Sequence, residues 1–207
     1  MLLPRTCPAC GRPGEAPCER CRRELRPARS LPPPPLVDRC AAFLDYSGVG
    51  REVVARLKYR NARSGLAFLA DGMAAMVDRD SIGVVTWVPT TNDRRAQRGF
   101  DQSELLARAV AARLGKPCRR LLRRLPGPAQ TGRALAERRR GPPFVAHSRR
   151  TPRQILLVDD VVTTGATVTS AARTLRAAGA EEVQVVAAAR TFPRGIHSSM
   201  ARVRVCG

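Results

Sequence analysis

The sequence predicts an α/β protein with a mostly parallel central sheet flanked by helices. Hydrophobic residues make up 43% of the 207 residues but aromatic residues only 4%, so the core has to be built from alanine, valine and leucine. Such a core suits stacked helices and strands better than an aromatic-rich β-sandwich. The segments 154–158 and 182–189 read as strands on either side of a helix at 165–179, and a right-handed crossover makes two such strands parallel.

Four of the seven cysteines stand near the N-terminus as two CxxC pairs, Cys7 with Cys10 and Cys18 with Cys21. Paired knuckles of this kind close around one metal ion, and a tetrahedral set of thiolates favours Zn²⁺. Disulfides are the alternative, but nothing in the sequence indicates export to an oxidising compartment. The spacing therefore predicts a small zinc ribbon with these four ligands.

A proline-rich stretch separates the cysteine pairs from the rest of the chain. Pro32 to Pro35 cannot continue a helix or a central strand. We therefore expect a zinc-binding module at 1–26, a linker at 27–36 and a larger domain at 37–207.

The first half of the larger domain alternates helix and strand patterns. Residues 51–77 have apolar positions at helical spacing, with a break around 61–65. The run 83–89 is short, apolar and rich in β-branched residues, which predicts a buried strand. Asp101 and Glu104 have the spacing of a capping box, so a further helix is expected to begin there.

Two segments are strongly basic. The loop 90–100 carries Arg94, Arg95 and Arg98 and follows the carboxyl end of a predicted strand, where open α/β sheets bind their ligands. The segment 119–153 holds eleven arginines and a single acid, a composition for which a solvated loop is the ordinary interpretation.

The formal net charge is +20, and nearly all of it comes from arginine. Biased composition explains this equally well as binding to a polyanion such as nucleic acid, because guanidinium groups bind phosphate bidentately. The most apolar stretch, 65–77, is interrupted by Asp71 and too short to span a membrane, and no secretory leader is recognisable. We therefore expect a cytoplasmic protein without a membrane span.

The stretch ILLVDDVVTTGATV at 155–168 carries the most specific functional pattern. Small residues and hydroxyls at 163–166 precede a helix, whose free backbone N–H groups can cradle a phosphate. Asp159 and Asp160 would repel that phosphate, so they are expected to serve another part of the ligand. Vicinal sugar hydroxyls with Mg²⁺ nearby fit both carboxylates. The pattern predicts a phosphorylated ribose.

The same string resembles the phosphoribosyl diphosphate signature of type I phosphoribosyltransferases. The cysteine pairs, ARLKYR at 55–60, VPTTNDRRAQRGFDQSELLARAVA at 88–111 and AQTGRALAERRR at 129–140 extend the resemblance over nearly the whole chain to the ComF family of competence-associated proteins. This resemblance implies a type I phosphoribosyltransferase fold with a small zinc ribbon. It also implies Mg²⁺ and phosphoribosyl diphosphate as ligands, and a role in competence or DNA uptake.

The resemblance also implies roles for individual residues. Asp159 and Asp160, the expected catalytic pair, belong at the ribose hydroxyls, the loop 163–167 surrounds the 5-phosphate, and 89–92 forms the loop on the diphosphate side. The expected ligand-binding residues are Pro89, Thr90, Thr91, Arg94, Arg95, Arg98, Thr163, Thr164, Gly165, Ala166 and Thr167.

Three positions depart from the family pattern. Thr91 stands where members commonly carry histidine, and Asp101 and Gly141 stand where they commonly carry asparagine. Two functions stay open on this basis. One is phosphoribosyl transfer to an acceptor that no motif identifies, and the other is non-catalytic sensing of the ligand or handling of single-stranded DNA, alone or with the DNA-uptake machinery. No motif indicates the oligomeric state.

Overall fold

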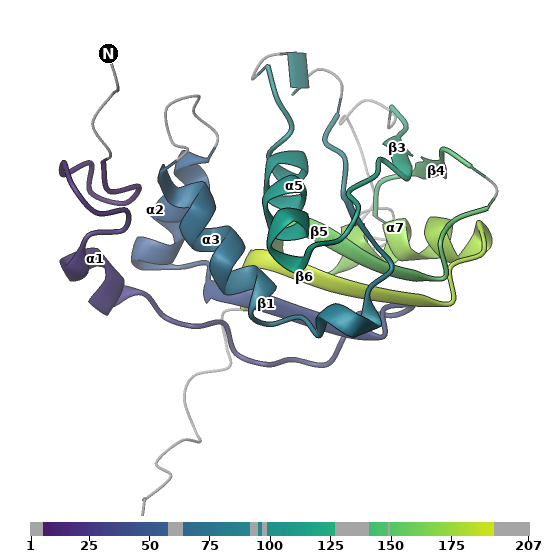
Figure 1. Ribbon diagram of the computed structural model, residues 1–207, viewed down its shortest axis with the longest axis horizontal. Coiled ribbons are helices and arrows are strands. Elements are labelled where there is room, and N and C mark those ends of the chain that lie inside the picture. The colour runs from purple at the N-terminus through teal and green to yellow at the C-terminus, as the bar shows by residue number, and fades with distance from the viewer. Residues whose placement is uncertain are drawn as a thin grey trace, which may run out of the picture.

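The computed structural model shows a central sheet with helices on both faces (Figure 1). It describes residues 6–57, 64–91, 95–96, 99–126, 141–148 and 150–192. The expected basic residues Arg94 and Arg98 and the segment AQTGRALAERRR lie outside these residues.

The sheet has four parallel strands in the order β1-β6-β5-β2. Their bounds are Arg39–Asp45 for β1, Val84–Trp87 for β2, Gln154–Val162 for β5 and Glu182–Arg190 for β6. This confirms the strands predicted near 83–89, 154–158 and 182–189 and the parallel pairing of the last two, whereas the sequence does not predict β1. Strand β5 continues further than expected, because Asp159 and Asp160 still belong to it.

Helices cover both faces of the sheet. One face packs against α2 (Gly48–Arg56), α3 (Ser64–Ala74) and α5 (Gln102–Leu114), and the opposite face against α7 (Ala166–Ala177). A short 3-10 turn, η1 (Arg79–Ser81), leads into β2. Two separate apolar clusters result, one on each face, and both consist mainly of aliphatic side chains.

The start of α5 is capped by Asp101, as the sequence predicts. Its carboxylate accepts the backbone N–H of Ser103 at 3.1 Å. The second half of the expected capping box differs, because the Glu104 carboxylate accepts hydrogen bonds from Arg108 at 2.8 and 3.0 Å. The Glu104 side chain therefore forms a salt bridge one turn along the helix in place of the hydrogen bond of a capping box.

The arginine-rich segment is not simply a solvated loop. Its two ends form an antiparallel hairpin of β3 (Leu122–Arg124) and β4 (Phe144–Ala146). Leu122 and Phe144 are buried in the same apolar cluster as α7. Composition alone predicts a solvated loop here, because the few apolar residues that anchor the hairpin stand among many arginines.

The cysteine-rich segment packs beside α2, at the left end of Figure 1. It contains the short helix α1 (Glu19–Glu24). Cys7, Ala9 and Cys21 belong to the same buried cluster as α2 and α3. The following residues run along the sheet, where Ala28 donates its N–H to the carbonyl of Phe43 at 3.1 Å. No helix in the described part of the chain is long and apolar enough to cross a membrane.

Candidate functional site

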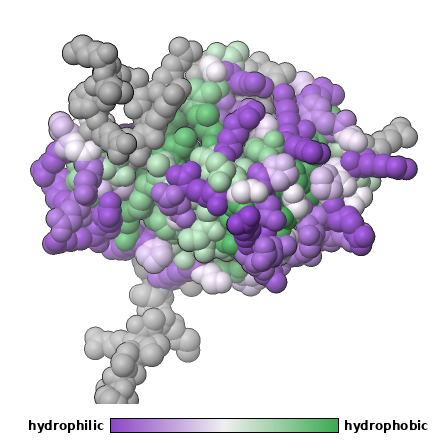
Figure 2. All heavy atoms as spheres, in the orientation of Figure 1, coloured by the Kyte–Doolittle hydropathy of each residue, from purple (hydrophilic) through white to green (hydrophobic). Residues whose placement is uncertain are grey.

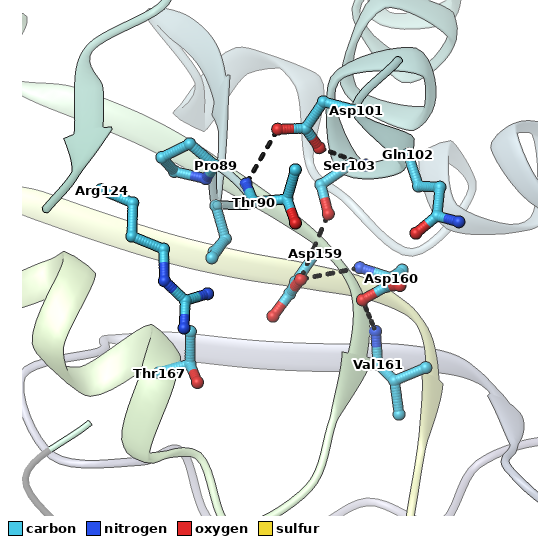
Figure 3. A pocket seen from close by; sticks show the side chains of 11 residues that line it. Pro89, Thr90, Asp101, Gln102, Ser103, Arg124, Asp159, Asp160, Val161 and Thr167 are labelled. Atoms are coloured by element: carbon cyan, nitrogen blue, oxygen red, sulfur yellow. Dashed lines mark hydrogen bonds between the residues drawn. The ribbon is translucent and has the colours of Figure 1, made fainter. Parts of the chain in front are cut away.

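A pocket of about 180 Å³ lies where β2 and β5 end (Figure 3). Four further elements reach it, namely the start of α5, the start of α7, the end of β3 and the loop after β2. The lining residues are Val88, Pro89, Thr90, Asp101, Gln102, Ser103, Arg124, Asp159, Asp160, Val161 and Thr167. This is the edge of a parallel sheet at which open α/β folds bind their ligands.

Asp159 lies at the centre of the pocket and is buried. One of its oxygens, Oδ1, accepts the hydroxyl of Ser103 at 3.3 Å and the N–H of Asp160 at 2.9 Å. Burial raises the pKa of Asp159 well above its usual range, and the neighbouring carboxylate of Asp160 raises it further. The pocket therefore disfavours ionisation of both carboxyl groups at once unless the ligand brings a hydrogen-bond donor or a cation.

Asp160 is less buried than Asp159, and its Oδ1 accepts the N–H of Val161 at 2.8 Å. In both carboxylates, Oδ1 accepts a hydrogen bond from the protein. Among the described residues, the structure gives no hydrogen bond to Oδ2 of either aspartate. An ionised carboxylate oxygen accepts hydrogen bonds from hydroxyl groups, so a diol is a matching partner.

Asp101 links the loop after β2 to helix α5. Its Oδ2 accepts the N–H of Thr90 at 2.9 Å, while Oδ1 accepts that of Ser103. Burial raises its pKa, against these backbone donors and that of Glu104, which lower it. An asparagine in the same orientation would turn its NH2 group toward one of these two N–H groups. The aspartate at this position therefore matches both backbone donors with its two oxygens.

The loop before α7 leaves the start of the helix open. Gly165 is the N-cap residue, with a φ of 78°, and has no side chain with which to cap the helix. The Thr164 hydroxyl accepts the N–H of Ala166 at 3.4 Å, while Thr167 faces the pocket. Backbone N–H groups and the dipole of a 12-residue helix together favour an anion at this place.

Arg124 brings a positive charge to the pocket from β3. Its side chain extends to the Thr167 side of the pocket (Figure 3). The hairpin that carries it is fixed to α7, because Ser170 donates its hydroxyl to the carbonyl of Pro142 at 2.7 Å and Thr174 to that of Phe144 at 3.4 Å. The cation is therefore held over the first turns of α7.

Gly141 also contacts α7. It has a φ of 73°, and a Cβ added there would overlap the carbonyl oxygen of Ala166. Asparagine, expected here by resemblance, would not fit without a shift of the hairpin. Glycine at this position allows the hairpin to approach the helix closely.

The pocket brings together five of the residues that the sequence predicts for ligand binding and catalysis: Pro89, Thr90, Asp159, Asp160 and Thr167. Thr163 to Ala166 lie in the loop before α7 and do not line the pocket. Thr91, in the loop after β2, does not line it either. Arg95 is exposed and donates its N–H to the carbonyl of Thr91 at 3.0 Å.

Sequence reasoning did not identify Ser103 and Arg124 as pocket residues. Ser103 could have been found from its position two residues after the capping aspartate. A residue there lies in the first turn of the helix and can face the end of the neighbouring strand. No local pattern singles out Arg124, because several arginines surround it.

The four cysteines form a second site. Their sulfur atoms all lie within 4.8 Å of one another, and those of Cys10 and Cys18 are 3.7 Å apart. Four thiolates at ~2.3 Å around one tetrahedral ion are separated by ~3.8 Å, so the cluster fits a metal ion. No disulfide joins cysteines in the described part of the chain. The four residues can therefore hold a metal.

The surroundings of the four thiols are unequal. Burial raises the pKa of Cys7, but backbone N–H groups of Cys10, Cys18 and Ala9 outweigh it and lower that pKa to about 6. Burial and the neighbouring thiols raise the pKa of Cys21 to about 12. A cation is needed before all four sulfurs can be thiolates together.

The chain is similar to known proteins over most of its length. Residues 102–202 match the phosphoribosyl transferase domain family. The chain is similar to the DNA utilization protein YhgH of Salmonella typhimurium, with 32% identity over 199 residues, covering 90% of this chain and 84% of the relative. It is also similar to the competence protein ComFC of Bacillus subtilis, with 30% identity over 179 residues, covering 82% and 70%.

A purine phosphoribosyltransferase from Pyrococcus horikoshii Ot3 is among the similar solved structures. The likeness covers 67% of this chain and 93% of that one, with 13% identity and a TM-score of 0.41. The matched domain and the parallel sheet with its flanking helices confirm the predicted type I phosphoribosyltransferase fold. Given the identity to YhgH and ComFC over most of their length, together with the cysteine cluster, the chain belongs to the ComF family.

Proposed function

We propose that this protein binds phosphoribosyl diphosphate with Mg²⁺ in the pocket at the ends of β2 and β5. The observation that carries the proposal is that Asp159, Asp160 and the first turn of α7 face one cavity. A ribose 5-phosphate needs both groups at once, because its hydroxyls donate to carboxylates and its phosphate accepts from backbone N–H groups. A dinucleotide or P-loop motif is absent from the sequence.

Different residues of the pocket would bind different parts of the ligand. Asp159 and Asp160 accept hydrogen bonds from the ribose hydroxyls, and the loop 163–167 holds the 5-phosphate. The diphosphate extends toward Pro89 and Thr90. Oxygen donors at this edge of the sheet suit Mg²⁺, which would neutralise the charge of the diphosphate. The sequence offers no motif for the acceptor of a phosphoribosyl group.

Calorimetric titration with Mg²⁺ and phosphoribosyl diphosphate tests the proposal. Asp159→Asn and Asp160→Asn keep the side-chain shape but remove the charge from the hydrogen bonds to the ribose. Charge-assisted bonds contribute about 1.5–3 kcal/mol each, so affinity should fall at least about tenfold in each variant. Asp80→Asn, at an exposed position in η1, is the control. Wild-type affinity in both pocket variants would refute the assignment.

Arg124→Ala should lower affinity for the same ligand about tenfold, because a guanidinium beside a phosphate contributes on this scale. Arg123→Ala is the matched control. It is exposed on β3, and neighbouring residues of a strand point to opposite faces. Titration of both variants with ribose 5-phosphate and with inorganic diphosphate identifies the end of the ligand that Arg124 contacts. Equal affinities in the two variants would exclude Arg124 from the site.

Catalysis requires a further measurement. Release of diphosphate from phosphoribosyl diphosphate in the presence of nucleobases would identify the protein as a transferase. Tight binding without release would identify it as a sensor on the same fold.

We also propose that the four cysteines hold Zn²⁺. The soft thiolate donors and the close approach of the four sulfur atoms support this ion over Mg²⁺ or Ca²⁺, which prefer oxygen. The ion would fix the cysteine-rich segment, which is too small to have a core of its own.

Nucleic-acid handling is the second candidate function. The net charge of +20 favours it, as do relatives named for DNA utilization and competence. Hydrophilic side chains dominate both ends of the face in Figure 2. Only 4% of residues are aromatic, so base stacking can contribute little to such binding.

If DNA binds, its affinity should fall log-linearly with salt and depend little on sequence, because the contacts are to phosphates. The arginines of 119–153 should carry most of it. Fluorescence anisotropy with a labelled single strand at two salt concentrations measures the slope. A double Arg119→Ala, Arg120→Ala variant should weaken binding more than the control, Arg20→Ala with Arg51→Ala, all four being exposed. Affinity insensitive to salt would contradict this mode.

A further inference from the structure

Residues 27–38, here called the strap, connect the cysteine-rich segment to β1 and are anchored at both ends. At the start, Pro27 forms a β-bridge with Leu44. At the other end, Arg176 of α7 donates to the carbonyl of Leu36 at 3.0 Å and to Asp38 at 2.6 Å. The strap therefore spans the edge of the sheet and ends against the helix whose start faces the pocket.

Between these anchors, Pro34 is buried against Gly165. A Cβ added to Gly165 would lie 2.7 Å from Cγ and 3.0 Å from Cβ of Pro34. Real atoms do not approach so closely, so the proline ring occupies the space that any side chain at this position would need. Gly165 also has a φ of 78°, which glycine adopts without strain.

The strap is held in one conformation near this contact. Leu36 has a φ of 66°, the only left-handed residue other than glycine in the described part of the chain. Such a backbone costs about 1–2 kcal/mol and persists only where the surroundings impose it. Val37 donates its N–H to the carbonyl of Pro34 at 3.2 Å, which closes a turn. A proline ring on this turn is a rigid support.

We propose that Pro34 is a positioning residue that holds the loop 163–167 in its phosphate-binding conformation. The inference rests on the proposed function of that loop. Thr163 and Thr164 are exposed and Gly165 has wide conformational freedom, so the loop has little support from its own side chains. Backbone N–H groups bind an anion well only when they already converge, because ordering them on binding costs free energy.

Hydrogen exchange tests the support without any ligand. Pro34→Ala should accelerate exchange of the loop amides at 163–167, whereas Pro33→Ala and Pro35→Ala should not. These neighbours are exposed prolines of the same strap, so they control for the general loss of a proline. Equal exchange in all three variants would refute the positioning role, whatever the loop binds.

The same variants are then titrated with Mg²⁺ and phosphoribosyl diphosphate. Pro34→Ala should bind about threefold to fivefold more weakly than either control, the effect of freeing one restrained backbone position. Unchanged affinity would contradict the proposal. Failure of the wild type to bind would instead refute the proposed function, and the exchange result would still decide the positioning role.

A measurement on the wild type covers the case in which Pro34→Ala does not fold. If the strap stabilises the binding conformation, the ligand must stabilise the strap by the same free energy. Mg²⁺ with phosphoribosyl diphosphate should therefore slow exchange of the Val37 amide, which bonds to Pro34. The amide of Ile82, after η1 and remote in sequence from the strap, is the internal control. Binding without protection at Val37 would overturn the proposal.

Discussion

Cys10→Ser should lower the melting temperature of the whole protein by at least about 10 °C. A structural zinc ion contributes roughly 10–16 kcal/mol of folding free energy in isolated zinc fingers, and about 1 kcal/mol moves the midpoint by 2–4 °C in a chain of this size. Cys10 is exposed, so its replacement leaves no cavity and reports on the metal alone. Calorimetry of protein purified without a histidine tag measures the shift.

The control is Cys118→Ser, because this cysteine lies outside the cluster and is partly buried. Elemental analysis should find one Zn²⁺ per chain in the wild type and in this control, and less in Cys10→Ser. A zinc content near zero in the wild type, or disulfides among the four cysteines in a reduced preparation, would contradict the metal assignment.

Gly165→Asp should abolish detectable binding of phosphoribosyl diphosphate. The carboxylate adds negative charge beside the phosphate site, and the Cβ collides with Pro34 in a backbone conformation that disfavours any L-residue. Calorimetric titration, with circular dichroism to confirm folding, measures the loss.

Gly165→Ala separates these causes. It brings the same collision and a backbone strain of about 1–2 kcal/mol, but no charge. Any further loss in the aspartate variant is then electrostatic and should shrink at high salt. Wild-type affinity in Gly165→Asp would mean that the loop does not bind phosphate.

Much of the architecture follows from local pattern. Apolar runs such as 154–158 become buried parallel strands because both faces of the sheet are covered by helices. Asp101 caps α5 because a carboxylate at that position satisfies a helix N–H wherever the helix packs. The order of small residues, acids and glycine at 155–168 likewise predicts which strand end carries the pocket.

The remaining features depend on tertiary contacts. Arg124 differs from its neighbours only because hairpin β3–β4 docks on α7 and turns this one guanidinium toward the pocket. Pro34 belongs to a stretch that composition marks as a linker, yet it is buried because the loop at Gly165 lies opposite. Sequence identifies prolines that interrupt helices and strands, but not the surface against which they pack.

The shared core beneath the cysteine cluster limits where this protein can be divided into separate pieces. Cys7 and Cys21 are buried with Val53 of α2, and a Cβ at Gly65 would approach Pro8 to 3.0 Å. A truncated chain beginning after the cysteines would therefore uncover aliphatic surface on α2 and α3 and tend to aggregate. A segment transplanted from a distant relative would need a matching helix surface on α2 and α3.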